Sequence, residues 1–356
     1  MANIWFRIAF PDRILGLWHK GRETRDAFQD FKRYMVEMID TRKEQASEED
    51  RDDLFSNLIS AVALENEGTD KMSQTRTFGD SELVGNVFIF LFAGHETTAH
   101  SLAFTLALLA AHPAIQEKLY QSIRDLVPEE KQPTYAKIVR WPYGLAVITE
   151  ALRLYPPVPD YPKVATEDCT FVTYSNDGKN TPISVSVPKG TKVLIDVAAI
   201  HFNPKYWKDP HEFHPERFMG DYNRDAFYTF AAGPRACMGR RFMEIEALTF
   251  LAHLVLNYRF EGTPLNEWET MEERKTRLLR WKMGSMTLHP EKTCLLIVWN
   301  AGFVSSVQQH PAEMINGVGG TEGYSRIVIR SGDDAINPLT IFFDGARFPA
   351  GHKDDT

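Results

Sequence analysis

The sequence predicts a mainly α-helical protein with a small β region. Apolar residues recur at three- and four-residue steps over long stretches, as expected for packed amphipathic helices. Short apolar or alternating runs separated by Gly and Pro predict a few strands. With 356 residues, of which 43% are hydrophobic and 25% are charged, the chain can bury a sizeable core in one large domain or two smaller ones.

Charge and cysteine content disfavour several classes of protein. A net charge of -8 argues against a nucleic-acid binder that depends on phosphate contacts, so no nucleic-acid partner is expected. The three cysteines, Cys169, Cys237 and Cys294, are too few and too scattered for a disulfide framework or a zinc cluster, which indicates a reducing environment. Arg7 and Asp12 interrupt the apolar start of the chain, so we expect no signal peptide or membrane anchor there.

The first part of the chain predicts helices over 12–45 and 54–61, followed by a much longer one. The long helix begins at Asp80-Ser81, whose side chains can accept the free N–H groups of a first turn, and it ends at His112-Pro113. At about 30 residues it could cross a domain or a bilayer. A carboxylate at mid-depth is costly in lipid, so passage through a protein centre is favoured and a membrane span over 83–111 is the rival.

Polar residues occupy the middle of this long helix, in Ala93-Gly94-His95-Glu96-Thr97-Thr98. Gly94 removes a side chain where a ligand would approach the backbone, and Glu96 and Thr97 can relay protons with Thr98 as support. Alternatively, the threonine hydroxyls bond back to preceding carbonyls and bend the helix. This stretch alone leaves both interpretations open.

The remaining elements alternate between helices and short strands. Glu150 and Arg153 lie three residues apart on one helical face and can pair, although an isolated pair of this kind is usually a surface pair worth little. Pro156-Pro157 stops that helix. The expected helices cover 114–126, 143–155 and 240–258, and the expected strands cover 171–174, 183–188, 191–197 and part of 279–290.

The loop Phe230-Ala231-Ala232-Gly233-Pro234-Arg235-Ala236-Cys237-Met238-Gly239 precedes the last of these helices. Main-chain N–H groups, the helix N-terminus and the cation of Arg235 all favour a thiolate at Cys237. Gly233 and Gly239 allow a tight turn and the close approach of a bulky planar ligand. A buried free cysteine behind a helix N-terminus is the alternative for a lone Cys.

This loop resembles the haem-binding pattern F-x-x-G-x-R-x-C-x-G of the cytochrome P-450 family, and Ala93 to Thr98 is similar to the family's oxygen-activation pattern. Pro215-Glu216-Arg217-Phe218, 20 residues before Cys237 when counted from Arg217, and the Glu150/Arg153 pair match further motifs in the family's order (237 − 217 = 20). The style of these motifs resembles fungal microsomal members. The resemblance covers about residues 20–297 and implies the C-terminal part of the cytochrome P-450 fold.

The resemblance also implies the chemistry of the site. The cofactor would be haem b (iron protoporphyrin IX), with the Cys237 thiolate as the axial iron ligand. The other residues carried over fall into three sets. Phe230, Gly233, Arg235, Gly239 and Lys163 would bind the cofactor, with Arg235 and Lys163 at its propionates; Glu96, Thr97 and Thr98 would manage protons; and Glu150, Arg153 and Arg217 would form a buried charge triad under the loop.

The implied function is a monooxygenase that inserts one oxygen atom of O2 into a hydrophobic small molecule. Electrons would come from NADPH through a flavoprotein, NADPH-cytochrome reductase, on the cytosolic face of the endoplasmic reticulum membrane. Arg240 and Arg241 either face an acidic electron donor or are simply solvated. The alternative function is a non-catalytic, truncated remnant that does not bind haem stably.

The resemblance stops at both ends of the chain. Family members have a longer N-terminal portion that includes the membrane anchor, so we expect residues 1–298 to form a partial haem domain that is truncated at its N-terminus and lacks that anchor. Residues 299–356 are an atypical tail, and eight of the chain's 22 glycines lie in it. Its apolar stretches 327–329 and 339–343 could add strands, but a disordered tail is the favoured expectation.

Overall fold

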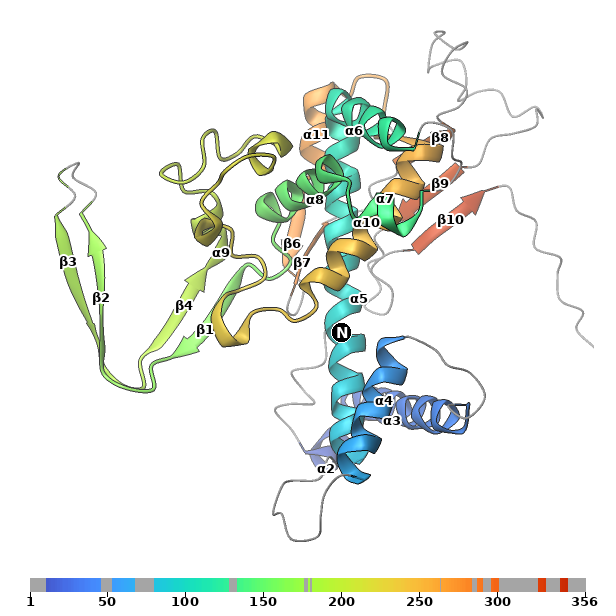
Figure 1. Cartoon of the computed structure of the whole chain (residues 1–356), viewed down its shortest axis with the longest axis vertical. Coiled ribbons are helices and arrows are strands. Elements are labelled where there is room, and N and C mark those ends of the chain that lie inside the picture. Colours follow the sequence, from blue (N-terminus) through green and yellow to red (C-terminus); the bar gives the residue numbers. More distant parts are fainter. Residues whose placement is uncertain are drawn as a thin grey trace, which may run out of the picture. The chain divides into compact units, whose positions relative to one another are not determined.

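Helices dominate the structure, and two-stranded sheets accompany them (Figure 1). The chain divides into two compact units, Met1–Thr97 and Thr98–Thr356. The computed structural model describes residues 11–45, 53–67, 80–127, 133–175, 179, 181–262, 264–283, 287–290, 296–300, 326–330 and 340–344.

Three helices and the start of a fourth form the first unit. They are α2 (Asp12–Leu15), α3 (His19–Gln45), α4 (Leu54–Glu67) and the beginning of α5 (Asp80–Ala111). The helical periodicity over 12–45 therefore belongs to a short helix and a long one. Apolar side chains from α3, α4 and α5 form a small core because each helix turns one stripe of them inward. The core residues are Met35, Ile39, Ile59, Val62, Leu83 and Val87.

Four helices and the end of α5 build the core of the second unit. Figure 1 shows α6 (Pro113–Leu126), α8 (Pro142–Leu154) and α10 (Arg240–Asn257) grouped together, with the short α7 (Tyr135–Ile138) beside them. Proline at the first turn of α6 and of α8 suits a helix start, where its missing N–H leaves no bond unmade. The most deeply buried side chains include Leu109, Leu119, Val147, Ala247 and Leu251.

The strands form antiparallel pairs. β1 (Asp160–Val164) pairs with β4 (Lys192–Asp196), β2 (Cys169–Tyr174) with β3 (Pro182–Val187), β5 (Tyr258–Gly262) with β8 (Leu296–Asn300), and β6 (Trp281–Met283) with β7 (Leu288–Pro290). The sequence predicted β2, β3 and β4, whereas it predicted neither β1 nor β5. It also missed the short helices α7, α9 (Val197–His201) and α11 (Met271–Leu278).

Two apolar stretches of the C-terminal tail pair with each other. β9 (Arg326–Arg330) and β10 (Thr340–Asp344) are antiparallel, with Ile329 opposite Ile341 and Ile327 opposite Phe343. The expectation of disorder for the rest of the tail concerns residues outside those that the structure describes.

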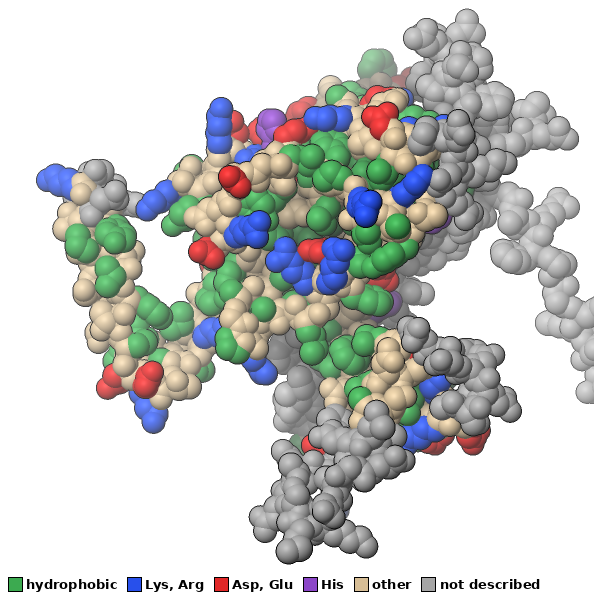
Figure 2. Space-filling model, in the orientation of Figure 1, with side chains coloured by type: hydrophobic (Ala, Val, Ile, Leu, Met, Phe, Trp, Pro, Cys, Tyr) green, Lys and Arg blue, Asp and Glu red, His purple; other side chains and the backbone are tan. Residues whose placement is uncertain are grey.

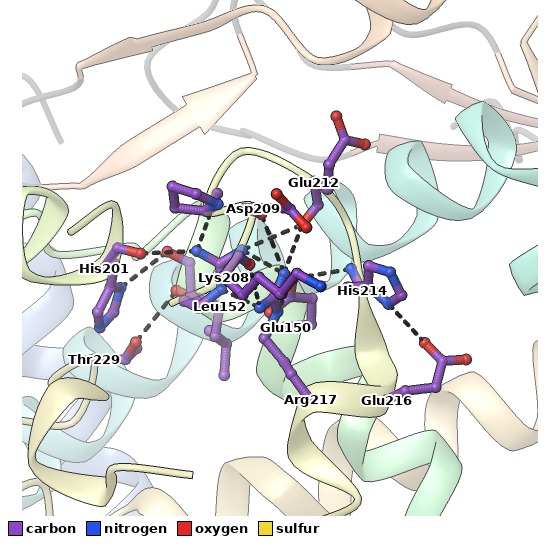
Figure 3. Close-up of polar contacts among 12 residues, drawn as sticks. Glu150, Leu152, His201, Lys208, Asp209, Glu212, His214, Glu216, Arg217 and Thr229 are labelled. Carbon is purple, nitrogen blue, oxygen red and sulfur yellow. Dashed lines mark hydrogen bonds and ion pairs between the residues drawn. The ribbon is translucent and has the colours of Figure 1, made fainter. Parts of the chain in front are cut away.

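A fully buried carboxylate on α8 binds two arginines. Glu150 Oε2 accepts a hydrogen bond from Arg153 Nε at 2.7 Å, while Oε1 accepts bonds from Arg153 Nη2 and Arg217 Nε, both at 2.9 Å. Oε1 also accepts the main-chain N–H of His214 at 2.9 Å (Figure 3). Glu150 and Arg153 are 0% exposed, so the network satisfies charges that have no access to water.

The remaining donors of the two arginines bind carbonyls of the irregular segment 202–217 and of α9. Arg153 Nη1 donates to the His201 and Pro210 carbonyls, both at 2.8 Å. Arg217 Nη1 donates to the Lys208 carbonyl at 2.8 Å. Because this segment has little regular structure of its own, these bonds fix its path across α8.

His201, at the end of α9, extends this network. Its Nδ1 donates to the Arg153 carbonyl at 2.9 Å, and its Nε2 accepts the main-chain N–H of Tyr228 at 2.9 Å, which assigns the proton of a neutral imidazole to Nδ1. Burial, together with the nearby Arg153 cation, lowers the pKa of His201 to about 4, although the bond to the Arg153 carbonyl opposes this shift.

We expect Arg217→Ala to destabilise the second unit by about 3 kcal/mol, because it leaves the buried Glu150 carboxylate with one cation in place of two. Urea unfolding of the variant and the wild type measures the difference. The matched control is Arg259→Ala, which removes an exposed ion pair with Glu261 and should cost less than about 1 kcal/mol. Equal losses in the two variants would contradict a special role for the buried network.

We also expect the free energy of unfolding to decrease as the pH is lowered, because His201 titrates. The unfolded imidazole takes up a proton near its ordinary pKa of 6.5, whereas the folded one resists until about 4, so stability is lost between these values. The loss is about 3 kcal/mol at its limit. Urea unfolding at a series of pH values should show this slope in the wild type and a shallower one in His201→Gln. Parallel slopes would show that another group titrates.

Candidate functional site

The cysteine loop, Phe230 to Gly239, contains the short helix η3 (Gly233–Arg235) and leads into the N-terminus of α10. The main-chain N–H of Cys237 donates to the Phe230 carbonyl at 2.8 Å, which closes the loop into a compact turn. The thiol of Cys237 is free, and all residues from Ala232 to Met238 are exposed. The alternative of a buried cysteine behind a helix is therefore wrong for this structure.

Two residues of the loop have left-handed backbone conformations. Gly233 has φ of 74°, which only glycine adopts without a steric penalty. Ala231 has φ of 56°, which costs a residue with a Cβ about 1 kcal/mol or more. Its main-chain N–H donates to the Tyr228 carbonyl at 3.0 Å, so neighbouring contacts hold the strained turn in place.

Buried polar groups fasten the segment Tyr228–Phe230 just before this turn. The main-chain N–H of Tyr228 donates to His201. The Thr229 hydroxyl donates to the Leu152 carbonyl of α8 at 3.2 Å (Figure 3). The phenol of Tyr161, on β1, donates to the Thr229 carbonyl at 2.7 Å. Sequence reasoning missed these residues, and no local pattern marks any of them.

Tyr161 lies on the same strand as the predicted cation Lys163. Its ring packs edge-on against the Tyr228 ring with centroids 5.8 Å apart, and burial, assisted by the charge of Cys237, raises its pKa to about 12. Lys163 lies two residues further along β1, so its side chain leaves the same face of the strand. Lys163 and Arg235 are both exposed, and within the described ranges neither forms an ion pair.

The second predicted motif lies on α5. The Thr97 hydroxyl donates to the Ala93 carbonyl at 2.7 Å, which is the backbone-bonded arrangement that the sequence left open. Glu96 is half-buried, and Gly94 has no neighbouring atom within 4 Å of where a Cβ would stand. Glu96 and Thr97 belong to the first unit, whereas the buried Thr98 begins the second.

Arginines surround the start of α10. Arg240 Nε donates to Glu244 at 2.9 Å, and its guanidinium lies 5.2 Å from the centre of the Phe230 ring. Arg241 pairs with the same carboxylate at 3.4 Å. Figure 2 shows Lys and Arg side chains with acidic ones among them on this face of the molecule. The two arginines of α10 are therefore partly neutralised by their own helix.

The residues around Cys237 fit a planar, metal-bearing prosthetic group. Across the described part of the chain, no three His, Cys, Asp or Glu side chains are arranged to hold a bare metal ion. The thiol is accessible, the loop carries the exposed apolar side chain of Met238, and unpaired cations are available for acidic substituents. Iron in a haem accepts a thiolate in this way.

No single helix among the described residues is long and apolar enough to span a membrane. α5 and α6 pass that test only when taken together, and the chain bends by 110° between them. The expected absence of an anchor at the start of the chain concerns residues 1–10, which are outside the described ranges.

Comparison with curated proteins finds relatives across most of the chain. Cytochrome P450 monooxygenase 124 of Postia placenta is 43% identical over 298 residues, which are 83% of this chain and 56% of the relative. Cytochrome P450 3A11 of Mus musculus is 32% identical over 241 residues, 67% of this chain and 45% of the relative. Cytochrome P450 3A5 of Homo sapiens is 33% identical over 240 residues, which are 67% of this chain and 44% of the relative.

The chain thus spans about half the length of the curated relatives that it matches. A sequence model described as cytochrome P450 matches residues 2–288. This match agrees with the mainly helical architecture and its small strand region, and it confirms the resemblance inferred from the motifs. The chain belongs to the cytochrome P450 family.

Proposed function

We propose that this chain is the cysteine-bearing part of a haem-thiolate monooxygenase, an oxidoreductase that inserts one oxygen atom of O2 into an organic substrate. The observation that carries the proposal is the exposed Cys237 thiol in a strained loop whose preceding segment is fastened to α8, α9 and β1. In this proposal, residues 1–298 form a partial haem domain and residues 299–356 form an appended tail.

The cofactor would be haem b, and the Cys237 sulfur would bind its iron. When bound, the haem supplies the activation of O2 that no side chain can provide. Lys163 and Arg235 would bind its propionates, since both are exposed cations, Arg235 within the loop and Lys163 two residues from Tyr161 on β1. Gly233 and Gly239 would let the backbone approach the macrocycle, and the Phe230 ring would pack beside it.

Glu96, Thr97 and Thr98 would manage protons. In this structure the Thr97 hydroxyl donates a hydrogen bond to the Ala93 carbonyl. Rotation about χ1 would release that bond and free Oγ1 to give up a proton, which Glu96 would then replace. Thr98, which is buried, would support the position of this stretch of the helix.

The proposed partners follow from the family. Electrons would come from NADPH through a flavoprotein, NADPH-cytochrome reductase, and the substrate would be a hydrophobic small molecule. Association with the cytosolic face of the endoplasmic reticulum membrane belongs to the same proposal. The name of the fungal relative, a monooxygenase, supports this reaction class.

The second candidate is a non-catalytic remnant that does not hold haem stably. The exposure of the loop from Ala232 to Met238 favours it, because a ligand held on one open face gains fewer contacts than an enclosed one. The two candidates differ in one measurable property, the absorption spectrum of the reduced, carbon monoxide-bound chain after loading with haem.

We expect the wild-type chain to show a thiolate-type Soret band in that spectrum, and we expect Cys237→Ser to lose it because a neutral hydroxyl replaces the thiolate. The matched control is Cys169→Ser, which removes another exposed free thiol, on β2, and should keep the band. A thiolate band that survives in Cys237→Ser would refute the ligand assignment. No band in the wild type would favour the remnant.

Removal of the Thr97 hydroxyl should leave haem bound but waste reducing equivalents as hydrogen peroxide. We expect Thr97→Ala to lower the yield of oxygenated product per NADPH by roughly 100-fold, the usual scale for loss of a proton-transfer group. The assay needs the reductase and a hydrophobic compound chosen because it shifts the haem spectrum of the wild type. Thr97→Ser keeps the hydroxyl and should restore coupling. A fully coupled Thr97→Ala protein would contradict the role.

A further inference from the structure

We propose that His201 is a positioning residue for Cys237. It would fix the position of the cysteine loop relative to α8 through hydrogen bonds from both nitrogens of a neutral imidazole. This role rests on the proposed function of Cys237 as the haem ligand. Its physical basis is a series of hydrogen bonds that runs from the buried Glu150 and Arg153 pair to Tyr228, and a further bond from Phe230, two residues along the main chain, to Cys237.

His201 is held rigidly on the side of α8. Its Nδ1 donates to the Arg153 carbonyl at 2.9 Å, and Arg153 Nη1 donates back to the His201 carbonyl at 2.8 Å. The imidazole stacks on the Phe227 ring with centroids 5.5 Å apart and planes 5° from parallel. The residue is 0% exposed, so the ring has one orientation and one tautomer available to it.

The other nitrogen of His201 reaches the loop. Nε2 accepts the main-chain N–H of Tyr228 at 2.9 Å. Two residues later, the Phe230 carbonyl accepts the N–H of Cys237 at 2.8 Å, so the position of this short segment sets the position of the cysteine. Ala231, which follows Phe230, keeps its strained φ because its N–H donates to the Tyr228 carbonyl.

Two further bonds explain why loss of His201 should shift the loop rather than unfold it. The Thr229 hydroxyl donates to the Leu152 carbonyl, and the Tyr161 phenol donates to the Thr229 carbonyl. These bonds fix one residue of the segment between α8 and β1. His201 supplies the separate bond at Tyr228, without which the segment can pivot about Thr229 and move the thiol.

Three substitutions separate the two hydrogen bonds of His201. The His201→Gln amide reaches the place of Nε2 and can accept from Tyr228, whereas the His201→Asn amide reaches only the place of Nδ1 and can donate to the Arg153 carbonyl. His201→Phe keeps the stacking on Phe227 and loses both bonds. Positioning predicts that Gln retains the wild-type properties of the loop and that Asn and Phe lose them.

Two readouts test this prediction. Hydrogen–deuterium exchange of the chain without added haem should be about tenfold faster at the Tyr228 and Cys237 amides in the Asn and Phe variants than in the wild type, which corresponds to one net hydrogen bond. After haem loading, the same variants should bind haem but show a larger fraction without the thiolate-type Soret band. The Gln variant should match the wild type in both readouts.

The outcomes are separable. Wild-type exchange rates at Tyr228 and Cys237 in the Asn and Phe variants would overturn the proposal, and so would loss of protection in the Gln variant equal to that in Asn. If the wild type forms no thiolate band, the proposed function fails while the exchange measurement still decides whether His201 holds the loop. If the Phe variant does not fold, the comparison of Gln with Asn decides the question alone. Gln keeps the bond to Tyr228 and loses the one to the Arg153 carbonyl, and Asn does the reverse.

Discussion

The buried carboxylate of Glu150 is the constraint on which the second unit depends. A charge with no access to water must be matched by cations and hydrogen-bond donors, and here two arginines and one main-chain N–H supply them. The other N–H groups of those arginines donate to carbonyls of α9 and of the 202–217 segment. The need to neutralise Glu150 therefore also fixes the path of this irregular segment. The path of the chain toward the cysteine loop follows from this requirement.

The same constraint continues into the loop through main-chain atoms. Arg153 and His201 bind each other twice, and His201 binds Tyr228. A turn with left-handed residues at Ala231 and Gly233 would relax if its flanks were free. Its flanks are instead bound on one side to α8 and β1 through Thr229 and continue on the other into α10. The thiol can therefore lie on an exposed surface while its position is set from the buried side.

The sequence predicted the long helices and the cysteine loop because both are encoded locally. Apolar spacing marks α3, α5 and α10, and glycines at fixed distances mark the turn before Cys237. The bonds that hold the loop are not local: His201 lies 48 residues from Arg153 and 27 from Tyr228, and Tyr161 lies 68 residues from Thr229. Nothing in α9, which has five residues, distinguishes a histidine with this role from one that only fills space. Glu150, Arg153 and Arg217 were grouped through the family's motif order, since their spacing alone suits a surface pair.

The hydrogen bonds that hold the loop explain which residue types are required around Cys237. The side chains that hold the loop bind main-chain N–H and carbonyl groups of Tyr228, Thr229 and Leu152; they are His201, Thr229 and Tyr161. The exposed side chains of the loop are therefore not needed to hold it in place. Gly233 must remain glycine for its backbone angle. A loop held by its backbone can present different exposed side chains, such as Met238, without moving its thiol. The exposed surface around the loop can thus change while the position of the thiol, set by α8 and α9, is kept.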